Sequence, residues 1–218
     1  AYSNQGEKHV AKIEKLVLEN KIGGLIFMQG GPLRQATLIN RYQHLSKVPL
    51  MVSIDGEWGL AMRLDSTVKY PWQMTLGAIQ DEQLIYEMGV DIGEQCKRLG
   101  IHVNFAPVVD INVNPKNPII NARSFGENKE NVASKGIAYM KGMQSVNVMA
   151  NAKHFPGHGD TDKDSHKSLP TINHTKSRMD SVELYPFYKL IENGLASMMV
   201  AHLNIPAYAE VANTATTL

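Results

Sequence analysis

Short apolar runs alternate with amphipathic helical segments along almost the whole chain, and this alternation limits the possible folds more than any other feature. Residues 7–20 place Val10, Ile13, Leu16 and Val17 on one helical stripe, and residues 25–28 then have the pattern of a buried strand. Strands that alternate with helices are typical of βα units with a parallel sheet. The predicted helices are 7–20, 33–46, 81–99, 128–145 and 177–193, and the predicted strands are 25–28, 50–54, 101–109, 148–152 and 197–201.

Polar residues follow these strands in a regular way. Asp55, Asp110, His154 and His202 each lie close to the carboxyl end of a predicted strand. Such convergence is expected both for a (β/α)8 barrel and for an open doubly wound sheet. No glycine-rich phosphate fingerprint follows a strand, since Gly23-Gly24 precedes one. We therefore predict an α/β fold of the (β/α)8 TIM-barrel type, incomplete in this chain because about five of the eight strands are present.

The composition limits the class of function. With 218 residues, of which 43% are hydrophobic, the chain can form one sizeable core. Its formal net charge of +1 gives no electrostatic case for binding nucleic acid or an anionic membrane. No apolar run approaches the roughly 20 residues of a membrane span. The single cysteine, Cys96, excludes an intrachain disulfide framework.

The stretch 153–166 concentrates polar chemistry, because the predicted strand 148–152 leads directly into a segment rich in His, Gly and Asp. A metal site would use His154 and His158, which are four residues apart. Pro156 and the glycine after it interrupt any helix that would put both imidazoles on one face. We therefore expect no metal and no cofactor here.

The acidic residues of the same stretch have two further interpretations. The run from Asp160 to Asp164 resembles the start of a calcium loop, but its sixth position is Ser165 and its twelfth is Thr171, where Gly and Glu are needed. The alternative is catalytic. A carboxylate and an imidazole with one residue between them, as in Asp164 and His166, can hydrogen-bond, which fixes the tautomer of the ring and raises its basicity.

Together these residues carry a family resemblance. The sequence KHFPGHG, then four residues, then DSH resembles the signature of the glycoside hydrolase family 3 β-N-acetylglucosaminidases, which are bacterial enzymes that act on cell-wall sugars. Further segments are similar to family landmarks and follow the family's order. They are IGGLIF at 22–27, IDGE at 54–57, APVVD at 106–110, ARSFG at 122–126 and MVAH at 199–202.

The resemblance implies roles for individual residues. His166 would be the general acid/base and Asp164 would hold it, whereas most glycosidases use two carboxylates. Asp55 would accept hydrogen bonds from sugar hydroxyls. The simpler interpretation of Asp55 is a strand-end cap, and that of Lys153 is a snorkelling residue at the edge of the core. The residues expected to line the sugar pocket are Asp55, Arg63, Arg123, Lys153 and His154, while Asp110 and His202 are expected to be supporting or structural.

The sequence departs from the family in two places. Where the family usually has Asp-Gln-Glu-Gly-Gly-Arg, residues 55–60 are DGEWGL, and Trp58 either stacks on a sugar or fills the core. The family's nucleophile is an Asp on the strand after the one that ends at His202, so we expect it beyond Leu218. The family's first strand is likewise expected upstream of Ala1.

The expected function is retaining hydrolysis of terminal β-linked N-acetylglucosamine, from peptidoglycan-derived or related sugars. Residues 1–218 would be a family 3 catalytic domain truncated at both ends, with a fused downstream domain as a further possibility. The partner is then a carbohydrate substrate, in the bacterial cytoplasm or cell envelope. The alternatives are a phosphorylase or a β-glucosidase of the same family, and an inactive sugar-binding module. A neutral acid/base suits phosphate as an acceptor, because a carboxylate would repel that anion.

Overall fold

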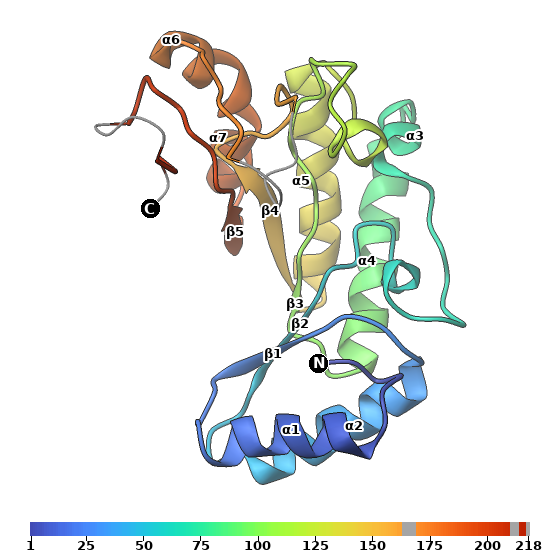
Figure 1. Ribbon diagram of the computed structural model, residues 1–218. Helices are drawn as coiled ribbons and strands as arrows, with labels where there is room; N and C mark the ends of the chain where they lie inside the picture. The colour runs from blue at the N-terminus through green and yellow to red at the C-terminus, as the bar shows by residue number, and fades with distance from the viewer. Residues whose placement is uncertain (163–168, 210–213, 217–218) are drawn as a thin grey trace.

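The structure is a computed structural model that describes residues 1–162, 169–209 and 214–216. Five parallel strands form one sheet, and their order in space is their order in the chain (Figure 1). The register pairs Leu25 with Val52 and Ile54 with Asn104. The strands are β1 (Gly24–Phe27), β2 (Met51–Ile54), β3 (Val103–Asn104), β4 (Met149–Phe155) and β5 (Ser197–Val200).

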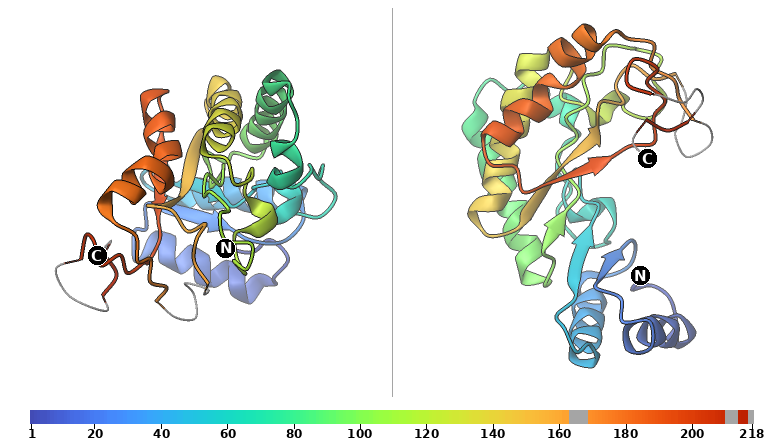
Figure 2. Two further views of the ribbon diagram at one scale, coloured as in Figure 1. Left: turned by 90° about the horizontal axis from the view of Figure 1, so that it is seen from above. Right: turned by 90° about the vertical axis from the view of Figure 1, so that its left-hand side faces the viewer.

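Helices cover the outer side of this curved sheet (Figure 2). Helix α1 packs beside α2, and α5 packs between α4 and α7. Shorter helices occupy the connections. The helices are α1 (Glu7–Leu18), α2 (Pro32–Leu45), α3 (Gln73–Gly77), α4 (Glu82–Arg98), α5 (Lys129–Ser145), α6 (Lys176–Arg178) and α7 (Tyr185–Glu192), with single turns η1 (Leu60–Met62), η2 (Asn121–Arg123) and η3 (Met179–Glu183).

The strand order decides between the two folds that the sequence left open. In a doubly wound sheet the strand order reverses at one point, and helices then cover both faces. Here the order β1-β2-β3-β4-β5 never reverses. Successive right-handed crossovers in one direction put the helices on a single face, as in a barrel. The prediction of an incomplete (β/α)8 barrel is therefore confirmed, and the five strands form an open arc.

The N-terminal residues extend this arc. The Ala1 amino group donates to the carbonyl of Ile26 at 2.6 Å, and the Met28 amide donates to the carbonyl of Ala1 at 2.9 Å. The Ser3 amide continues the ladder to the carbonyl of Gln29 at 2.8 Å. The family's first strand before Ala1 stays a prediction. Residues 1–3 already run along the outer edge of β1 and pair with it.

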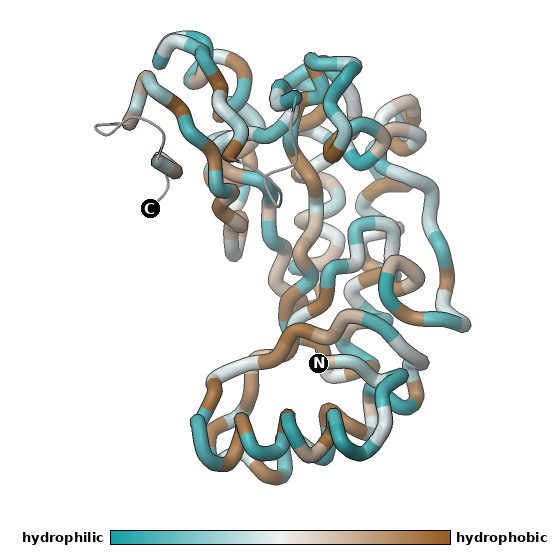
Figure 3. The backbone as a smooth tube through the Cα atoms, viewed as in Figure 1, coloured by the Kyte–Doolittle hydropathy of each residue, from teal (hydrophilic) through white to brown (hydrophobic). Residues whose placement is uncertain are grey.

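The two faces of the sheet differ in exposure. Leu25, Phe27 and Val52 are buried against the helices, whereas Ile26 and Met51 on the opposite face are exposed, Met51 to 52%. The concave face carries an open, largely apolar hollow of about 680 Å³. Figure 3 shows the strands as mainly hydrophobic and α1 as a mixture of hydrophilic and hydrophobic residues within each turn. In a closed barrel the concave face is the packed interior.

Side chains set several helix boundaries near the predicted positions. The Asp81 carboxylate accepts the Gln83 amide at 3.0 Å at the start of α4, and the Asn128 amide oxygen accepts the Asn131 amide at 2.7 Å at the start of α5. Both caps satisfy amides that have no partner within the helix. After α4 the chain turns at Gly100, whose φ of +75° is easily adopted only by glycine.

The strand predicted over residues 101–109 is the main difference in the sheet. Regular pairing covers only Val103–Asn104, because Pro107 has no amide hydrogen to donate. The following residues remain extended beside β4, with the Asn151 amide donating to the carbonyl of Ala106 at 2.8 Å and the Val109 amide to that of Lys153 at 2.9 Å. This irregular continuation still carries Asp110 to the same end of the sheet as β4.

The helix predicted over residues 177–193 is divided into three pieces. Helix α6 passes into a wider turn, in which the Leu184 amide donates to the carbonyl of Met179 at 2.8 Å, and α7 then begins. Pro186 explains the break, because it donates no hydrogen bond to the preceding turn and is favoured at the start of a helix. The remaining predicted helices agree with the structure within two residues at each end.

The contact between α4 and α5 depends on glycine. A Cβ atom added at Gly142 would lie 2.2 Å from the carbonyl oxygen of Tyr86, so a side chain here forces the helices apart. We expect Gly142→Ala to lower the free energy of unfolding by about 2 kcal/mol, even though alanine favours the helix. Gly23→Ala is the matched control, because nothing lies within 4 Å of its added Cβ. Urea unfolding of both variants checks this, and equal midpoints would contradict the packing argument.

Candidate active site

The polar residues at the carboxyl end of the sheet form one connected group. Asp55 directly follows β2, and its carboxylate contacts the ammonium of Lys153 on β4 and the guanidinium of Arg63. Lys153 is only 1% exposed, whereas the side chains of Asp55 and Arg63 are about one fifth exposed, at 19% each. Asp55 therefore joins a buried cation to a partly open one at the mouth of the arc.

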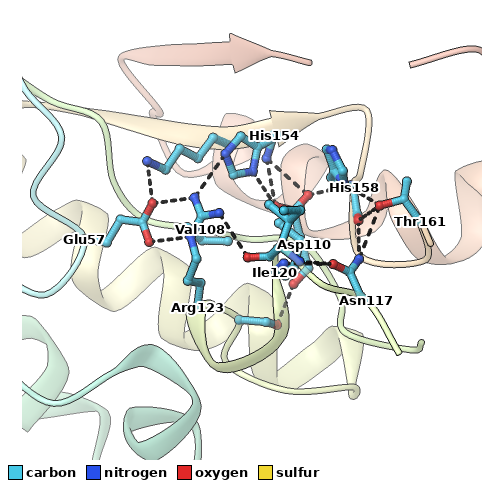
Figure 4. Close-up of polar contacts among 12 residues, drawn as sticks. Glu57, Val108, Asp110, Asn117, Ile120, Arg123, His154, His158 and Thr161 are labelled. Atoms are coloured by element: carbon cyan, nitrogen blue, oxygen red, sulfur yellow. Dashed lines mark hydrogen bonds and ion pairs between the residues drawn. The ribbon is translucent and has the colours of Figure 1, made fainter. Parts of the chain in front are cut away.

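Glu57 was not among the predicted site residues, yet it contacts two cations of this group, Lys153 and Arg123 (Figure 4). Its Oε1 lies 2.7 Å from the Nζ atom of Lys153 and 2.6 Å from Nη2 of Arg123, and its Oε2 accepts from Nε of Arg123 at 2.9 Å. The arginine thus binds the carboxylate in a two-point fork. The glutamate side chain is 1% exposed, so both contacts are shielded from water.

The surroundings keep Glu57 ionised. Burial acts to raise the pKa of its carboxyl group, but the charge of Lys153 and the hydrogen bonds from Arg123 outweigh it and hold the pKa at about 2. Each of the two carboxylates therefore faces two cations, with Lys153 shared between them. Arg63 and Lys153 face Asp55, and Lys153 and Arg123 face Glu57.

Asp110 organises the start of the histidine-rich loop. Its buried carboxylate accepts the backbone amide of His154 at 3.1 Å and that of His158 at 2.7 Å, and its Oδ2 lies 2.7 Å from Nδ1 of His154. The Lys153–His154 peptide bond between the two site residues of β4 is cis. Asp110 therefore fixes both the backbone and one side chain of this loop, in keeping with the supporting role expected for it.

These contacts also determine the tautomer of His154. Burial acts to raise the pKa of Asp110, but the imidazole of His154 and the contacts of His158 outweigh it, so the pKa is lowered and the group is ionised. An ionised carboxylate only accepts, so Nδ1 of His154 carries the hydrogen. In the neutral ring Nε2 is then an acceptor, and it lies 3.4 Å from Nη2 of Arg123.

His158 is held in the interior and is not aimed at this group of charges. Its Nδ1 lies 2.6 Å from Oγ1 of Thr161, and burial lowers the pKa of its imidazole, so the ring is neutral. Asn117 donates to its carbonyl at 2.8 Å. Among the described residues no group of three or more His, Cys, Asp or Glu side chains could hold a metal ion. Asp160, from the calcium-like run, instead contacts His174 at 2.6 Å.

The structure brings together five of the seven predicted site residues. They are Asp55, Arg63, Arg123, Lys153 and His154, all linked through the contacts above. The other two, Asp164 and His166, lie outside the described residues. His202 follows β5 and is exposed.

Trp58 has an aromatic partner that the sequence did not suggest. Its ring stacks on that of Trp72, with centroids 4.3 Å apart and an interplanar angle of 26°. The Tyr70 amide donates to the carbonyl of Trp58 at 3.1 Å, which brings the chain two residues before Trp72 back to Trp58. Trp58 is half-buried and Trp72 is exposed, so the pair lies at the rim and not in the core.

Comparison with known proteins identifies the family. The profile of the glycosyl hydrolase family 3 N-terminal domain matches residues 4–217. The chain belongs to glycosyl hydrolase family 3. The resemblance drawn from the KHFPGHG and DSH segments is confirmed at the level of the family. In the family's usual Asp-Gln-Glu-Gly-Gly-Arg segment Glu57 has the place of the glutamate, and this match was the signal in the sequence that pointed to it.

Individual relatives agree with this assignment. Beta-hexosaminidase A of Pseudoalteromonas piscicida is 37% identical over 210 residues, which cover 90% of this chain and 35% of that protein. The beta-N-acetylglucosaminidase/beta-glucosidase of Cellulomonas fimi is 30% identical over 188 residues, covering 86% of this chain and 33% of that protein. This chain therefore spans about a third of the length of these two relatives.

A solved family 3 structure supports the fold as well. The glycoside hydrolase family 3 beta-N-acetylglucosaminidase from Paenibacillus sp. str. FPU-7 superposes with a TM-score of 0.87 at 41% sequence identity. The match covers 92% of this chain and 40% of that one. None of the helices in the described residues is both long and apolar enough to cross a membrane.

Proposed function

We propose that residues 1–218 are part of the catalytic domain of a retaining glycoside hydrolase that removes terminal β-linked N-acetylglucosamine. The observation that carries this proposal is the linked group of charges at the carboxyl end of the sheet, in a chain of family 3. Asp55, Arg123 and Lys153 offer there the acceptors and donors that sugar hydroxyls need. The names of the relatives support the amino sugar, and we propose peptidoglycan-derived or related sugars as its source.

The proposed reaction is a double displacement. An aspartate expected beyond Leu218 attacks the anomeric carbon while His166 protonates the leaving oxygen, so the glycosidic bond breaks as the enzyme–sugar bond forms. His166 then takes a proton from water, which attacks the same carbon and releases the sugar and the carboxylate. Asp164 holds His166, and Asp55 accepts hydrogen bonds from the sugar hydroxyls, with Arg63, Arg123, Lys153 and His154 beside it.

The acceptor separates a hydrolase from a phosphorylase. A neutral acid/base is compatible with phosphate. In the described part of the site, three cations, Arg63, Lys153 and Arg123, face the carboxylates of Asp55 and Glu57, and this arrangement is compatible with either acceptor. The test is turnover in phosphate-free buffer. Loss of activity there, restored by added phosphate, would make the enzyme a phosphorylase.

Two further alternatives share one assay. The name of the Cellulomonas fimi relative includes beta-glucosidase, and a module that binds sugar without turnover is also compatible with the site. The full-length protein is given a 4-nitrophenyl N-acetyl-β-glucosaminide and, alongside, the matching β-glucoside. We expect rapid turnover of the amino sugar. Preference for the glucoside would indicate a β-glucosidase, and N-acetylglucosamine binding without turnover of either substrate would indicate a binding module.

The assignment of His166 predicts a dependence on the leaving group. We expect His166→Ala to slow a natural disaccharide by at least about 100-fold and a 4-nitrophenyl glycoside by much less, because a good leaving group departs without a proton. His44→Ala, an exposed histidine on α2, is the control. Steady-state kinetics on both substrates check this. Equal losses on both would remove His166 from the acid role.

A further inference from the structure

Buried side chains hold the backbone of Gly56 and Glu57 in place. The amide of Gly56 donates to Oδ1 of Asn104 at 2.9 Å, and Nδ2 of Asn104 donates back to the carbonyl of Gly56 at 3.1 Å. The hydroxyl of Tyr139, on α5, donates to the carbonyl of Glu57 at 3.1 Å. Both Asn104 and Tyr139 are fully buried. The backbone that carries the carboxylate is therefore fixed by contacts that no substrate could displace.

The contacts of Glu57 determine which hydrogens of the two cations stay available. Lys153 has three N–H groups. One points to Asp55 and one to Glu57, which leaves the third available. Arg123 has five; two go to Glu57, one to the carbonyl of Ile119 at 3.1 Å and one to Nε2 of His154, which again leaves one. Within the described residues, each cation thus keeps one donor for a ligand.

We infer that Glu57 is a positioning residue, which aims the remaining N–H groups of Lys153 and Arg123 at the sugar. This inference rests on the proposed function and extends it to a residue that need not touch the substrate. Lys153 and Arg123 have long side chains from different elements, β4 and η2. The Glu57 carboxylate is the contact they share, so it sets their separation and direction together.

The charge of Glu57 is essential to this role. Two cations at 2.6 and 2.7 Å from the same oxygen would repel each other without it. A glutamine in its place keeps the shape but presents an amide NH₂ group to donors. One or both cations must then turn away. A misplacement of about 1 Å in groups that orient a substrate lowers the rate by about 100-fold.

The test compares Glu57→Gln with the wild type in the full-length protein. We expect kcat/KM for 4-nitrophenyl N-acetyl-β-glucosaminide to fall about 100-fold, mostly through a higher KM, and the Kd for N-acetylglucosamine to rise at least tenfold. Glu14→Gln is the matched control. It removes a carboxylate that contacts Arg41 at 2.6 Å on α1 and α2, and it should leave both quantities unchanged.

A double-mutant cycle separates positioning from a purely structural role. If Glu57 acts through Arg123, adding Glu57→Gln to Arg123→Met should cost far less than it costs in the wild type. A structural role predicts that Glu57→Gln lowers kcat/KM by the same factor in the wild type and in Arg123→Met. That result would overturn the inference. So would a folded Glu57→Gln variant with wild-type KM and kcat.

If Glu57→Gln does not fold, Glu57→Asp decides, because it keeps the charge but shortens its reach. We expect Glu57→Asp to lose at least tenfold in kcat/KM, and wild-type activity would overturn the inference.

The same measurements keep the two proposals apart. A wild-type protein that turns over the substrate while Glu57→Gln is unaffected contradicts only the role of Glu57. A wild-type protein that binds N-acetylglucosamine without turnover contradicts the hydrolase, and the ratio of dissociation constants then still decides Glu57. A wild-type protein that does neither contradicts both.

Discussion

Asp110→Ala should lower the free energy of unfolding by about 3–5 kcal/mol and abolish most activity, and this is the largest effect on stability that we expect. The carboxylate is fully buried and accepts the backbone amides of His154 and His158 as well as Nδ1 of His154. Alanine leaves all three donors without their acceptor. Each buried group that loses its partner costs about 1–3 kcal/mol.

Asp110→Asn refines the same prediction through pH. The pKa of Asp110 is lower in the folded protein than its ordinary value of 3.8, so its contribution to stability is complete above that pH and is lost as the pH falls below it. An asparagine does not titrate. We therefore expect the variant to have a lower free energy of unfolding than the wild type at neutral pH. This difference in free energy should become smaller as the pH is lowered.

Urea unfolding of the full-length protein between pH 3 and pH 7 checks both variants. Asp65→Ala, which removes an exposed carboxylate further along the loop after β2, is the control and should stay within about 0.5 kcal/mol of the wild type. If Asp110→Ala were as stable as this control, the histidine loop would not depend on Asp110.

Asp110 also illustrates what sequence reasoning can and cannot reach. Its place near a strand end was predictable from the apolar run before it. Most helices were predictable as well, because the apolar residues on the buried face of a helix recur with a period of 3.6 residues. Its partners were not predictable. They depend on the irregular path of residues 105–109, where Pro107 ends regular pairing, and on the loop after β4 folding back to meet the carboxylate.

The same limit explains why the contacts of Glu57 and the break in the last helix were not predicted. Asp55 and Glu57 are two residues apart, so an extended segment puts both on one side, but only the fold reveals that Arg123 reaches the second carboxylate from η2. The wide turn before α7 was hidden because Met179 and Leu184 fit a helical pattern as well. Local patterns determine elements, whereas contacts across about 66 residues, such as that between Glu57 and Arg123, need the whole topology.

Asp55→Asn should cause the largest loss of activity, about 1,000-fold in kcat/KM, with a much smaller loss of stability. Asparagine keeps the shape and one acceptor but loses the charge that strengthens a hydrogen bond to a sugar hydroxyl. A factor of 1,000 corresponds to about 4 kcal/mol of transition-state stabilisation. Lys153 keeps its contact with Glu57 in this variant, and Arg63 is partly open to water, so neither cation is left buried alone.

This result would decide between the two interpretations of Asp55. If it only caps the end of β2, the variant loses stability, and its activity falls no further than the folded fraction. If it binds the substrate, the midpoint of unfolding stays near that of the wild type while kcat/KM falls. Measuring both on the same preparation of full-length protein, with Asp65→Asn as the control, separates the two. A variant that keeps at least about a tenth of wild-type kcat/KM, roughly 1.4 kcal/mol, would exclude Asp55 from the substrate contacts that the reaction depends on.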